Sequence, residues 1–339
     1  MSTVNRHDFL AQAAALTGGS LLPFSNTARA EPPPEVSRIR VAKIPAICLA
    51  PEYLAEEMLK LEGFTQIEYP ELNRLDTQSL LLEDVADISV GTPSDLPPLW
   101  DTNKGKGVVA LAPIHGGCYE LFARDPVLSV RDLKGRRVAI ESIAYGVNTA
   151  YYYVSSIAAY IGIDPRKDIK WVEGKTFIGA MQLFVDGKAD AILGFAPQPR
   201  DLRAKKIGHV ILNTTQDRPW SQYFCCVVVA RREFVAQNPI ATRRALRAFL
   251  KSADVCSNEP ERAARMLVDK GYEPRYDVAL EVLKELPYNH WREANPEDTL
   301  RFHALRLHEV GMIKSIPEKL IAQGTDWRFL NELKKELKA

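Results

Sequence analysis

The spacing of hydrophobic and polar residues predicts strands alternating with helices from about residue 37 onward. Residues 37–42 alternate Ile39 and Val41 with charged neighbours, which is typical of a strand. Pro51 favours the first turn of a helix that reaches about Glu62, and Gly63 ends it. Further strands are expected at 65–69, 86–90 and 107–113, and a helix at 76–82. This alternation predicts an α/β fold with a parallel sheet covered on both faces.

The same pattern then starts again. Strands are expected at 135–140, 169–172 and 189–194, and helices at 145–161, with Ser142 as a candidate cap, and at 178–185. An Ala-Asp pair, an apolar strand and a glycine follow one another both at 86–91 and at 189–194, which predicts one α/β unit used twice. After an apolar strand at 223–229 the chain is mostly helical. Helices are expected at 239–256, 259–270, 276–286, 298–310, 317–322 and 326–337.

Size and charge narrow the classes of function. The chain has 339 residues, enough for two ordinary domains. It carries 44 Lys and Arg against 43 Asp and Glu, for a formal net charge of +1. A nearly neutral chain argues against broad nucleic-acid or anionic-membrane surfaces, which need clustered positive charge.

The N-terminus has the features of an export signal. Arg6 precedes a mildly apolar stretch at 9–22, and Ala28-Arg29-Ala30 fits a cleavage site. We therefore expect residues 1–30 to be a signal peptide cleaved after Ala30, residues 31–35 to be a linker, and the mature chain to be periplasmic. Residues 6–10 resemble a twin-arginine signal in which His7 replaces the second arginine, so the export route stays open. A mobile cytosolic tail is the alternative interpretation.

Five cysteines, Cys48, Cys118, Cys225, Cys226 and Cys256, cannot all pair within one chain. No Cys or His spacing is typical of a zinc site. Neighbouring residues of a strand point to opposite faces, so Cys225 and Cys226 are not expected to bond to each other. We expect all five to be buried small hydrophobic residues, with a long-range disulfide left open.

The chain lacks several motifs of catalysis. It has no G-x-S-x-G, P-loop, G-x-G-x-x-G or H-E-x-x-H sequence. His303 and His308 are five residues apart, a spacing that does not align two ligands on one helix face. No catalytic residue, metal or cofactor is therefore predicted.

Four short segments, in order, resemble a known family. Residues 132–139 (DLKGRRVA) resemble the D-L-K-G-K-x-V-A segment of type II substrate-binding proteins of ABC importers, and residues 162–169, 186–191 and 234–239 follow in that family's order. The set looks like the nitrate/sulfonate/taurine branch, which also contains binding proteins for thiamine-precursor pyrimidines. The resemblance extends over about 36–339.

The resemblance implies a type II periplasmic-binding fold with two α/β lobes. Lobe one would contain 36–120 and the mostly helical 228–339, and lobe two 121–227, with crossover segments near 115–123 and 220–229. A small solute would bind between the lobes, close them and reach an inner-membrane ABC permease. A monomer without catalytic activity is expected.

The candidate ligand-binding residues lie where strands end, because parallel α/β sheets bind ligands beyond the carboxyl ends of their strands. Ser142 to Asn148 occupies the position of the family's small-residue ligand loop, although Ile143, Ala144 and Tyr145 are bulkier or differ from that pattern. The candidates are Ala46, Ile47, Cys48, Thr92, Pro93, Ser94, His115, Ser142, Ala144, Tyr145, Gly146, Asn148, Phe195, Gln198, Trp220 and Tyr223. For His115 and the aromatic residues, packing in the core is the alternative role.

These loops contain no lysine or arginine, which favours a planar or partly apolar organic ligand over a strongly charged sulfonate. A weak acid, an aromatic compound and a sulfonate-like compound stay open as ligands. Two other functions also stay open. One is a pyrimidine-forming thiamine-biosynthesis enzyme of the same fold, and the other is a periplasmic ligand sensor.

Overall fold

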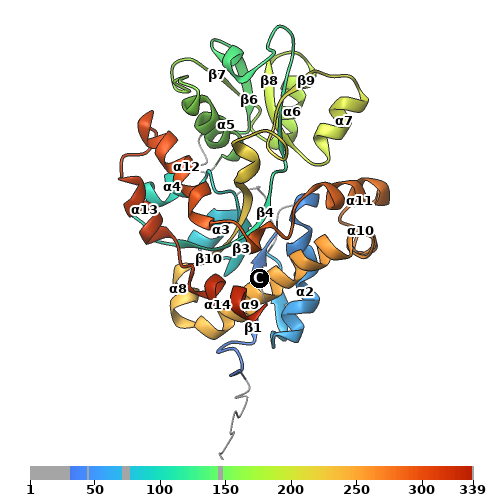
Figure 1. Cartoon of the computed structure of the whole chain (residues 1–339), viewed down its shortest axis with the longest axis vertical. Coiled ribbons are helices and arrows are strands. Elements are labelled where there is room, and N and C mark those ends of the chain that lie inside the picture. The colour runs from blue at the N-terminus through green and yellow to red at the C-terminus, as the bar shows by residue number, and fades with distance from the viewer. Residues whose placement is uncertain (1–30, 44–45, 71–76, 144–147, 338–339) are drawn as a thin grey trace, which may run out of the picture. The chain divides into compact units, whose positions relative to one another are not determined.

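Two five-stranded sheets organise the computed structural model, which describes residues 31–43, 46–70, 77–143 and 148–337 (Figure 1). The strand order is β2-β1-β3-β10-β4 in the first sheet and β7-β6-β8-β5-β9 in the second. The first sheet contains β1 (Arg38–Ala42), β2 (Gln66–Glu68), β3 (Ile88–Gly91), β4 (Val108–Gly116) and β10 (Phe224–Arg231). The second contains β5 (Tyr119–Ala123), β6 (Arg137–Ile140), β7 (Lys170–Glu173), β8 (Ala191–Phe195) and β9 (His209–Asn213).

The two sheets repeat one topology. In the first, β2, β1 and β3 are parallel and β10 runs antiparallel between β3 and β4. In the second, β7, β6 and β8 are parallel and β5 runs antiparallel between β8 and β9. The predicted α/β class with a repeated unit is therefore confirmed. The prediction of a parallel sheet was wrong in part, because the strand that follows each crossover, β5 or β10, runs antiparallel to its neighbours.

The repeated Ala-Asp pair has the same structural role in both sheets. The Asp87 carboxylate accepts a hydrogen bond from the backbone N–H of Arg40, at 2.9 Å, and binds its side chain. The Asp190 carboxylate accepts one from the backbone N–H of Arg137, at 2.8 Å, and also binds the arginine side chain. Each aspartate thus joins the residue before the third strand of its unit to the first strand, at Arg40 in the middle of β1 and at Arg137 at the start of β6.

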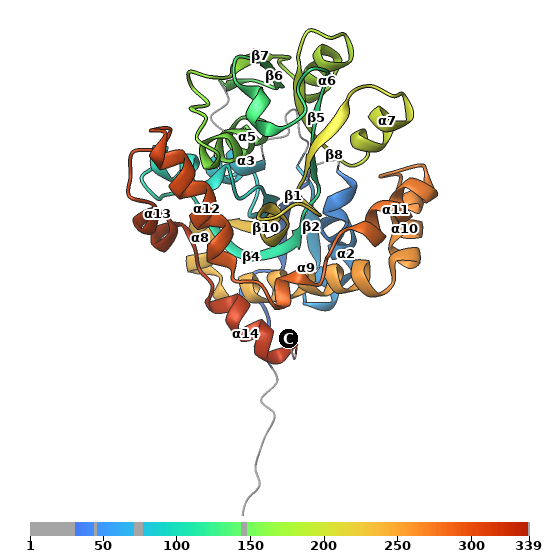
Figure 2. The ribbon, with the colours of Figure 1, turned by 45° about the horizontal axis from the view of Figure 1, so that its top comes forward.

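Helices cover both faces of each sheet, as expected when strands are apolar on both sides. On β10, Val227 and Val229 pack against α4, α12 and α13, whereas Val228 and Ala230 belong to the core formed with α2 and α9. In Figures 1 and 2, α12 and α13 lie on the opposite side of the first sheet from α2 and α10. In the second sheet, Phe122 and Ile192 pack with α6 and α7, and the other face packs with α5.

We call the first sheet with α2–α4 and α8–α14 the first lobe, and the second sheet with α5–α7 the second lobe. The helices of the first lobe are α2 (Ala50–Leu61), α3 (Thr77–Leu82), α4 (Leu96–Thr102), α8 (Arg232–Gln237), α9 (Pro239–Asn258), α10 (Pro260–Asp269), α11 (Tyr276–Glu285), α12 (Pro296–Glu309), α13 (Pro317–Gly324) and α14 (Arg328–Glu336). Those of the second are α5 (Thr149–Tyr160), α6 (Phe177–Val185) and α7 (Gln198–Ala204). Short 3₁₀ turns include η1 (Ile47–Leu49), η2 (Val130–Leu133), η4 (Trp220–Gln222) and η5 (His290–Arg292).

Two crossover segments join the lobes, between β4 and β5 and between β9 and β10. They touch where Gly117, at φ +66°, passes Thr215, and a Cβ at Gly117 would lie 2.5 Å from the Thr215 hydroxyl oxygen. The Thr214 hydroxyl oxygen accepts a hydrogen bond from the backbone N–H of Tyr119 at 3.0 Å. Glycine is therefore required at position 117 by both conformation and space.

A disulfide between Cys118 and Cys225 also links the crossover segments. Burial of all five cysteines is confirmed, but their description as small hydrophobic residues was wrong for this pair. The separation of 107 residues explains the error, because no local pattern indicates which distant residues meet. Cys225 and Cys226 are not bonded to each other, as predicted.

Several strands and helices were missed or misplaced in the sequence analysis. The strands β5 and β9 and the helices α4, α7 and α8 were not predicted, since each is short. Helix α5 begins at Thr149 with Asn148 as its cap, whereas Ser142 was the expected cap. The Asn148 side chain accepts a hydrogen bond from the backbone N–H of Tyr151 at 3.0 Å, while the Ser142 hydroxyl donates to Glu173 at 2.7 Å.

Among the described residues, every helix is too short or too polar to cross a membrane.

Candidate functional site

A small cavity of about 80 Å³ lies where the carboxyl ends of strands from the two lobes meet. From the first lobe it is lined by Ala46, Cys48, Leu49, Val90, Gly91, Thr92 and Cys226. From the second lobe it is lined by Tyr119, Glu141, Thr149 and Phe195. The lining is mainly apolar, with hydroxyl groups and one carboxylate as its polar groups.

The topology explains why these residues meet. Gly91 and Phe195 are the last residues of β3 and β8, the third strand of each repeated unit. Glu141 directly follows β6, and Ala46 to Leu49 lead from β1 into helix α2. A ligand in this cavity would face the strand ends of both sheets, which is where open α/β sheets bind their ligands.

Hydrogen bonds cross from one lobe to the other beside the cavity. The Thr149 hydroxyl, at the start of α5, donates to the Asp95 carboxylate at 2.6 Å and lies 3.3 Å from the Thr92 hydroxyl. The Thr92 hydroxyl is also 3.3 Å from the phenol oxygen of Tyr119, whose pKa is raised by burial. These contacts hold together the two walls of the cavity.

Two thiols form part of the cavity wall. Cys48 is the middle residue of η1, just before α2, and a hydrogen bond with Cys226 lowers the pKa of its thiol to about 6. The nearby His115 ring adds to this effect, while burial acts against it. The pKa of Cys226 is instead raised by burial. The pKa values of the two thiols in this wall are therefore shifted in opposite directions.

His115 lies next to these thiols, and its side chain is fully buried. Its Nδ1 is 3.1 Å from the carbonyl oxygen of Gly116, and its ring meets that of Tyr288 edge-on with 5.3 Å between centroids. Its Nε2 has no hydrogen-bond partner among the described residues. His115 is not among the residues that line the cavity.

Only some of the candidate residues reach the cavity. Ala46, Cys48, Thr92 and Phe195 line it. Gln198 supports Phe195, because its side-chain oxygen accepts a hydrogen bond from the Phe195 backbone N–H at 3.2 Å. Ser142 and Asn148 shape the loop before α5, where the Asn148 amide donates to the Ser142 carbonyl at 2.6 Å.

The remaining candidates lie elsewhere or cannot be placed. Ile47, Pro93 and Ser94 are buried and are not lining residues. Trp220 packs against Tyr160 of α5, and Tyr223 stacks on Phe302 of α12 with 4.6 Å between ring centroids. Ala144, Tyr145 and Gly146 lie outside the described residues.

Sequence reasoning missed several lining residues. They are Leu49, Val90, Tyr119, Glu141, Thr149 and Cys226. Glu141 could have been found, since it follows a predicted strand in the same way as the residues after β1. Tyr119 and Cys226 could not, because they reach the cavity through the crossovers rather than through a loop at a predicted strand end.

Comparison with known proteins agrees with this architecture. A model of the family described as NMT1/THI5 like matches residues 52–263, more than half of the chain. No curated protein sequence matches significantly.

Solved structures share the fold at low identity. The alkanesulfonate-binding protein SsuA from Xanthomonas axonopodis pv. citri, bound to MOPS, has a TM-score of 0.69 and 15% identity, over 88% of this chain and 99% of that one. The periplasmic nitrate-binding protein NrtA from Synechocystis PCC 6803 has a TM-score of 0.73 and 14% identity, over 90% of each chain. The desulfurization enzyme DSZB has a TM-score of 0.55 and 15% identity, over 89% and 100%.

Such identities establish the fold alone, but the family match rests on the sequence itself. Together with the two sheets of repeated topology, it confirms the resemblance found in the sequence. The chain belongs to the NMT1/THI5-like family and has the periplasmic-binding-protein fold.

Proposed function

We propose that this chain is the solute-binding component of an ABC-type import system. It captures a small organic ligand between its lobes by closing them, and delivers it to a permease in the inner membrane. The observation that carries this proposal is the cavity at the facing strand ends, with Thr92 on one wall and Thr149 and Phe195 on the other. A ligand held by both walls favours the closed arrangement over the open one.

The ligand we propose is small, partly apolar and planar. Leu49, Val90, Tyr119 and Phe195 offer apolar and aromatic surface, and Thr92 and Thr149 offer hydroxyl groups for orientation. No lysine or arginine is among the lining residues that the structure describes. That supports an aromatic or weakly acidic solute rather than a strongly charged anion.

Location and partners follow from the same proposal. Residues 1–30 act as the export signal, cleaved after Ala30, and the mature chain works as a periplasmic monomer without a cofactor. Residues 36–120 and 228–339 form one moving body and residues 121–227 the other. The family resemblance and the solute-binding proteins among the structural relatives support this assignment.

A thermal-shift screen against sulfonates, nitrate, pyrimidines and aromatic acids tests the ligand class. A compound that binds only the native state stabilises it by about 2.7 kcal/mol at a hundredfold excess over its dissociation constant, which raises the melting temperature. Phe195→Ala should weaken binding of the compound found, whereas Trp220→Ala, an aromatic residue outside the cavity, should not. An equal loss of ligand affinity in both variants would mean that the ligand binds outside this cavity.

Two further measurements test capture without chemistry. Small-angle scattering should show a smaller radius of gyration under saturating ligand, and an unchanged radius would count against lobe closure. Chromatography after prolonged incubation should recover the ligand unchanged. Recovery of a chemically changed product would favour the enzyme alternative. In a pull-down experiment, recovery of a receptor instead of a permease would favour the role of a ligand sensor.

A further inference from the structure

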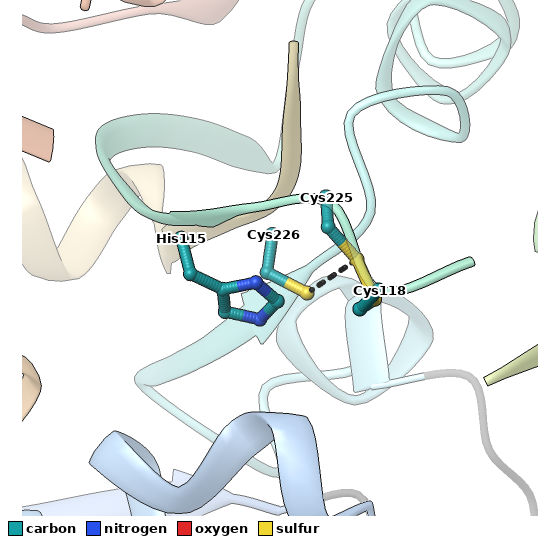
Figure 3. A group of neighbouring side chains, drawn as sticks. All are labelled: His115, Cys118, Cys225 and Cys226. Atoms are coloured by element: carbon teal, nitrogen blue, oxygen red, sulfur yellow. Dashed lines mark hydrogen bonds between the residues drawn. A yellow bond between two sulfur atoms is a disulfide. The ribbon is translucent and has the colours of Figure 1, made fainter. Parts of the chain in front are cut away.

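A cluster of sulfur and nitrogen donors lies at the junction of the two crossover segments, next to the ligand cavity. The donors of His115, Cys118, Cys225 and Cys226 all lie within 4.8 Å of one another. Figure 3 shows the Cys226 sulfur between the imidazole ring and the Cys118–Cys225 disulfide. The Cys226 and Cys225 sulfurs are 3.4 Å apart. Four donors from two distant segments of the chain thus converge on one point.

We propose that these four residues form a binding site for a thiophilic divalent metal ion, with Zn²⁺ as the reference ion, when the Cys118–Cys225 disulfide is reduced. This site shares Cys226 with the wall of the solute cavity, but its existence does not depend on the proposed transport function.

The donor set and its spacing fit such an ion. Three thiolates and one imidazole are an established ligand set of tetrahedral zinc. With zinc–sulfur bonds of about 2.3 Å, the sulfurs of a regular tetrahedron are about 3.8 Å apart. The observed upper limit of 4.8 Å requires only side-chain adjustments to reach that distance.

Burial and hydrogen bonding prepare the histidine for this role. His115 is fully buried, and its Nε2 has no hydrogen-bond partner among the described residues. Its Nδ1 lies 3.1 Å from the Gly116 carbonyl, so an Nδ1–H that donates there leaves the lone pair on Nε2. A backbone carbonyl that fixes the imidazole tautomer in this way is a usual feature of histidine ligands. A buried, unmatched nitrogen is costly, and a bound cation would satisfy it.

Cavities lie on two sides of the cluster. Cys226 lines the solute cavity, and Cys118 lines a separate cavity with Glu120, Pro197 and Arg200. The cluster therefore has open space beside Cys118 on one side and beside Cys226 on the other.

The proposed steps balance in electrons and protons. A dithiol reductant gives two electrons and two protons to the Cys118–Cys225 disulfide, which yields two thiols and the oxidised, cyclic reductant. Binding of Zn²⁺ then releases one proton from each of Cys118, Cys225 and Cys226, while neutral His115 supplies a lone pair. The metal takes over from the disulfide as the link between the crossover segments, so that both redox states of the chain keep that link.

The test uses the full chain, reduced with a phosphine and freed of metal, and titrated with Zn²⁺ against a chromogenic chelator. We expect one tightly bound Zn²⁺ per reduced chain, and binding at least about 100-fold weaker after reoxidation of the disulfide. Co²⁺ as a second probe should give thiolate-to-cobalt charge-transfer bands in the reduced chain alone.

Variants identify the donors. Cys226→Ser and His115→Ala should each weaken Zn²⁺ binding, whereas Cys256→Ser, a buried cysteine of α9 outside the cluster, should not. Loss of binding in Cys48→Ser with retention in His115→Ala would overturn the assignment of the donor set. Equal Zn²⁺ affinity of the reduced and oxidised chains would overturn the site itself.

A measurement on the wild-type chain covers the case in which a variant does not fold. Zn²⁺ should protect Cys118, Cys225 and Cys226 of the reduced chain from alkylation, as read by peptide mass spectrometry. Cys256 serves as the internal reference. Alkylation of the three cluster cysteines at the same rate with and without Zn²⁺ would contradict the proposal.

Discussion

Thr149 joins the two lobes through one hydroxyl group. It donates to the Asp95 carboxylate of the first lobe at 2.6 Å, beside the cavity. Thr149→Val keeps the shape of the side chain and removes the donor. Since a hydrogen bond to a charged group contributes about 1.5–3 kcal/mol, we expect ligand affinity to fall at least about tenfold by isothermal titration calorimetry.

Thr242→Val is the matched control. The Thr242 hydroxyl is also buried, but it donates to the Asn238 carbonyl at the start of helix α9, and Thr242 is not among the residues that line the cavity. A similar loss of affinity in both variants would mean that Thr149 acts through general stability instead of through lobe contact.

His303 makes stability depend on pH. It is fully buried beside the rings of Tyr153 and Phe302, and burial lowers the pKa of its imidazole to about 3. The unfolded chain takes up the proton near pH 6.5, so the stabilisation is complete above that pH and is lost as the pH falls towards 3. About 2 kcal/mol should be lost between pH 8 and pH 5.

Urea unfolding across this pH range checks the expectation. In His303→Gln the free energy of unfolding should decrease less between pH 8 and pH 5 than in wild type. This difference in slope is expected even if the substitution changes the stability at pH 8. His308→Gln, at an exposed position of the same helix, should leave the slope unchanged. An identical slope in wild type and His303→Gln would contradict the assignment of the titrating group.

At the scale of elements, the two repeated aspartates should differ in their contribution to stability. The Asp87 side chain is 7% exposed and binds both Arg40 and Arg231, whereas that of Asp190 is 23% exposed and binds Arg137. Asp87→Ala removes the buried partner of two arginines, which keep only the exposed Asp84, and should cost about 3 kcal/mol. Asp190→Ala, which leaves a more exposed arginine, should cost about 1 kcal/mol.

Chemical unfolding of both variants measures this difference. Both aspartates accept a hydrogen bond from a backbone N–H, that of Arg40 or that of Arg137. An equal loss of unfolding free energy in the two variants would mean that these hydrogen bonds contribute more than burial of the ion pairs.

Elements with a strong repeating pattern were predicted well. Strand β1, helix α2 and the long amphipathic helix α9 agree with the sequence-based ranges to within two residues, because each carries enough apolar positions to define its period. Strands β5 and β9 were missed because each is only five residues long and lies next to a crossover segment. The start of α5 depended on which of two polar residues, Ser142 or Asn148, faces the helix end, and that is decided by packing.

At the scale of the whole molecule, the Cys118–Cys225 disulfide closes a loop across the entire second lobe. The two cysteines are 107 residues apart, and a cross-link of that span stabilises the folded state by about 4–5 kcal/mol in the chain-entropy model. Reduction in the presence of a metal chelator should therefore lower the unfolding midpoint in urea substantially. The same midpoint with and without reductant would mean that the two crossovers are held by their other contacts.

Cys118→Ser with Cys225→Ser provides the control for that experiment. This double variant should have the lower midpoint from the outset and should not respond to reductant. The single substitution Cys256→Ser should respond as wild type does, because Cys256 is not bonded.

The sequence by itself determined the class of fold, the repeated unit and the order of most strands and helices. These depend on local periodicity and on short turn signals such as the Ala-Asp pairs at 86–87 and 189–190. It also predicted that strand ends would form the site, and Ala46, Cys48, Thr92 and Phe195 do line the cavity.

Only the tertiary structure decided which distant residues meet. Tyr119, Thr149 and Cys226 reach one cavity from three separate segments, and Cys118 pairs with Cys225 instead of with a nearer cysteine. Such meetings depend on how the crossovers pack against each other and against both sheets. No periodic pattern along the chain carries that information, because it arises from contacts between residues about a hundred positions apart.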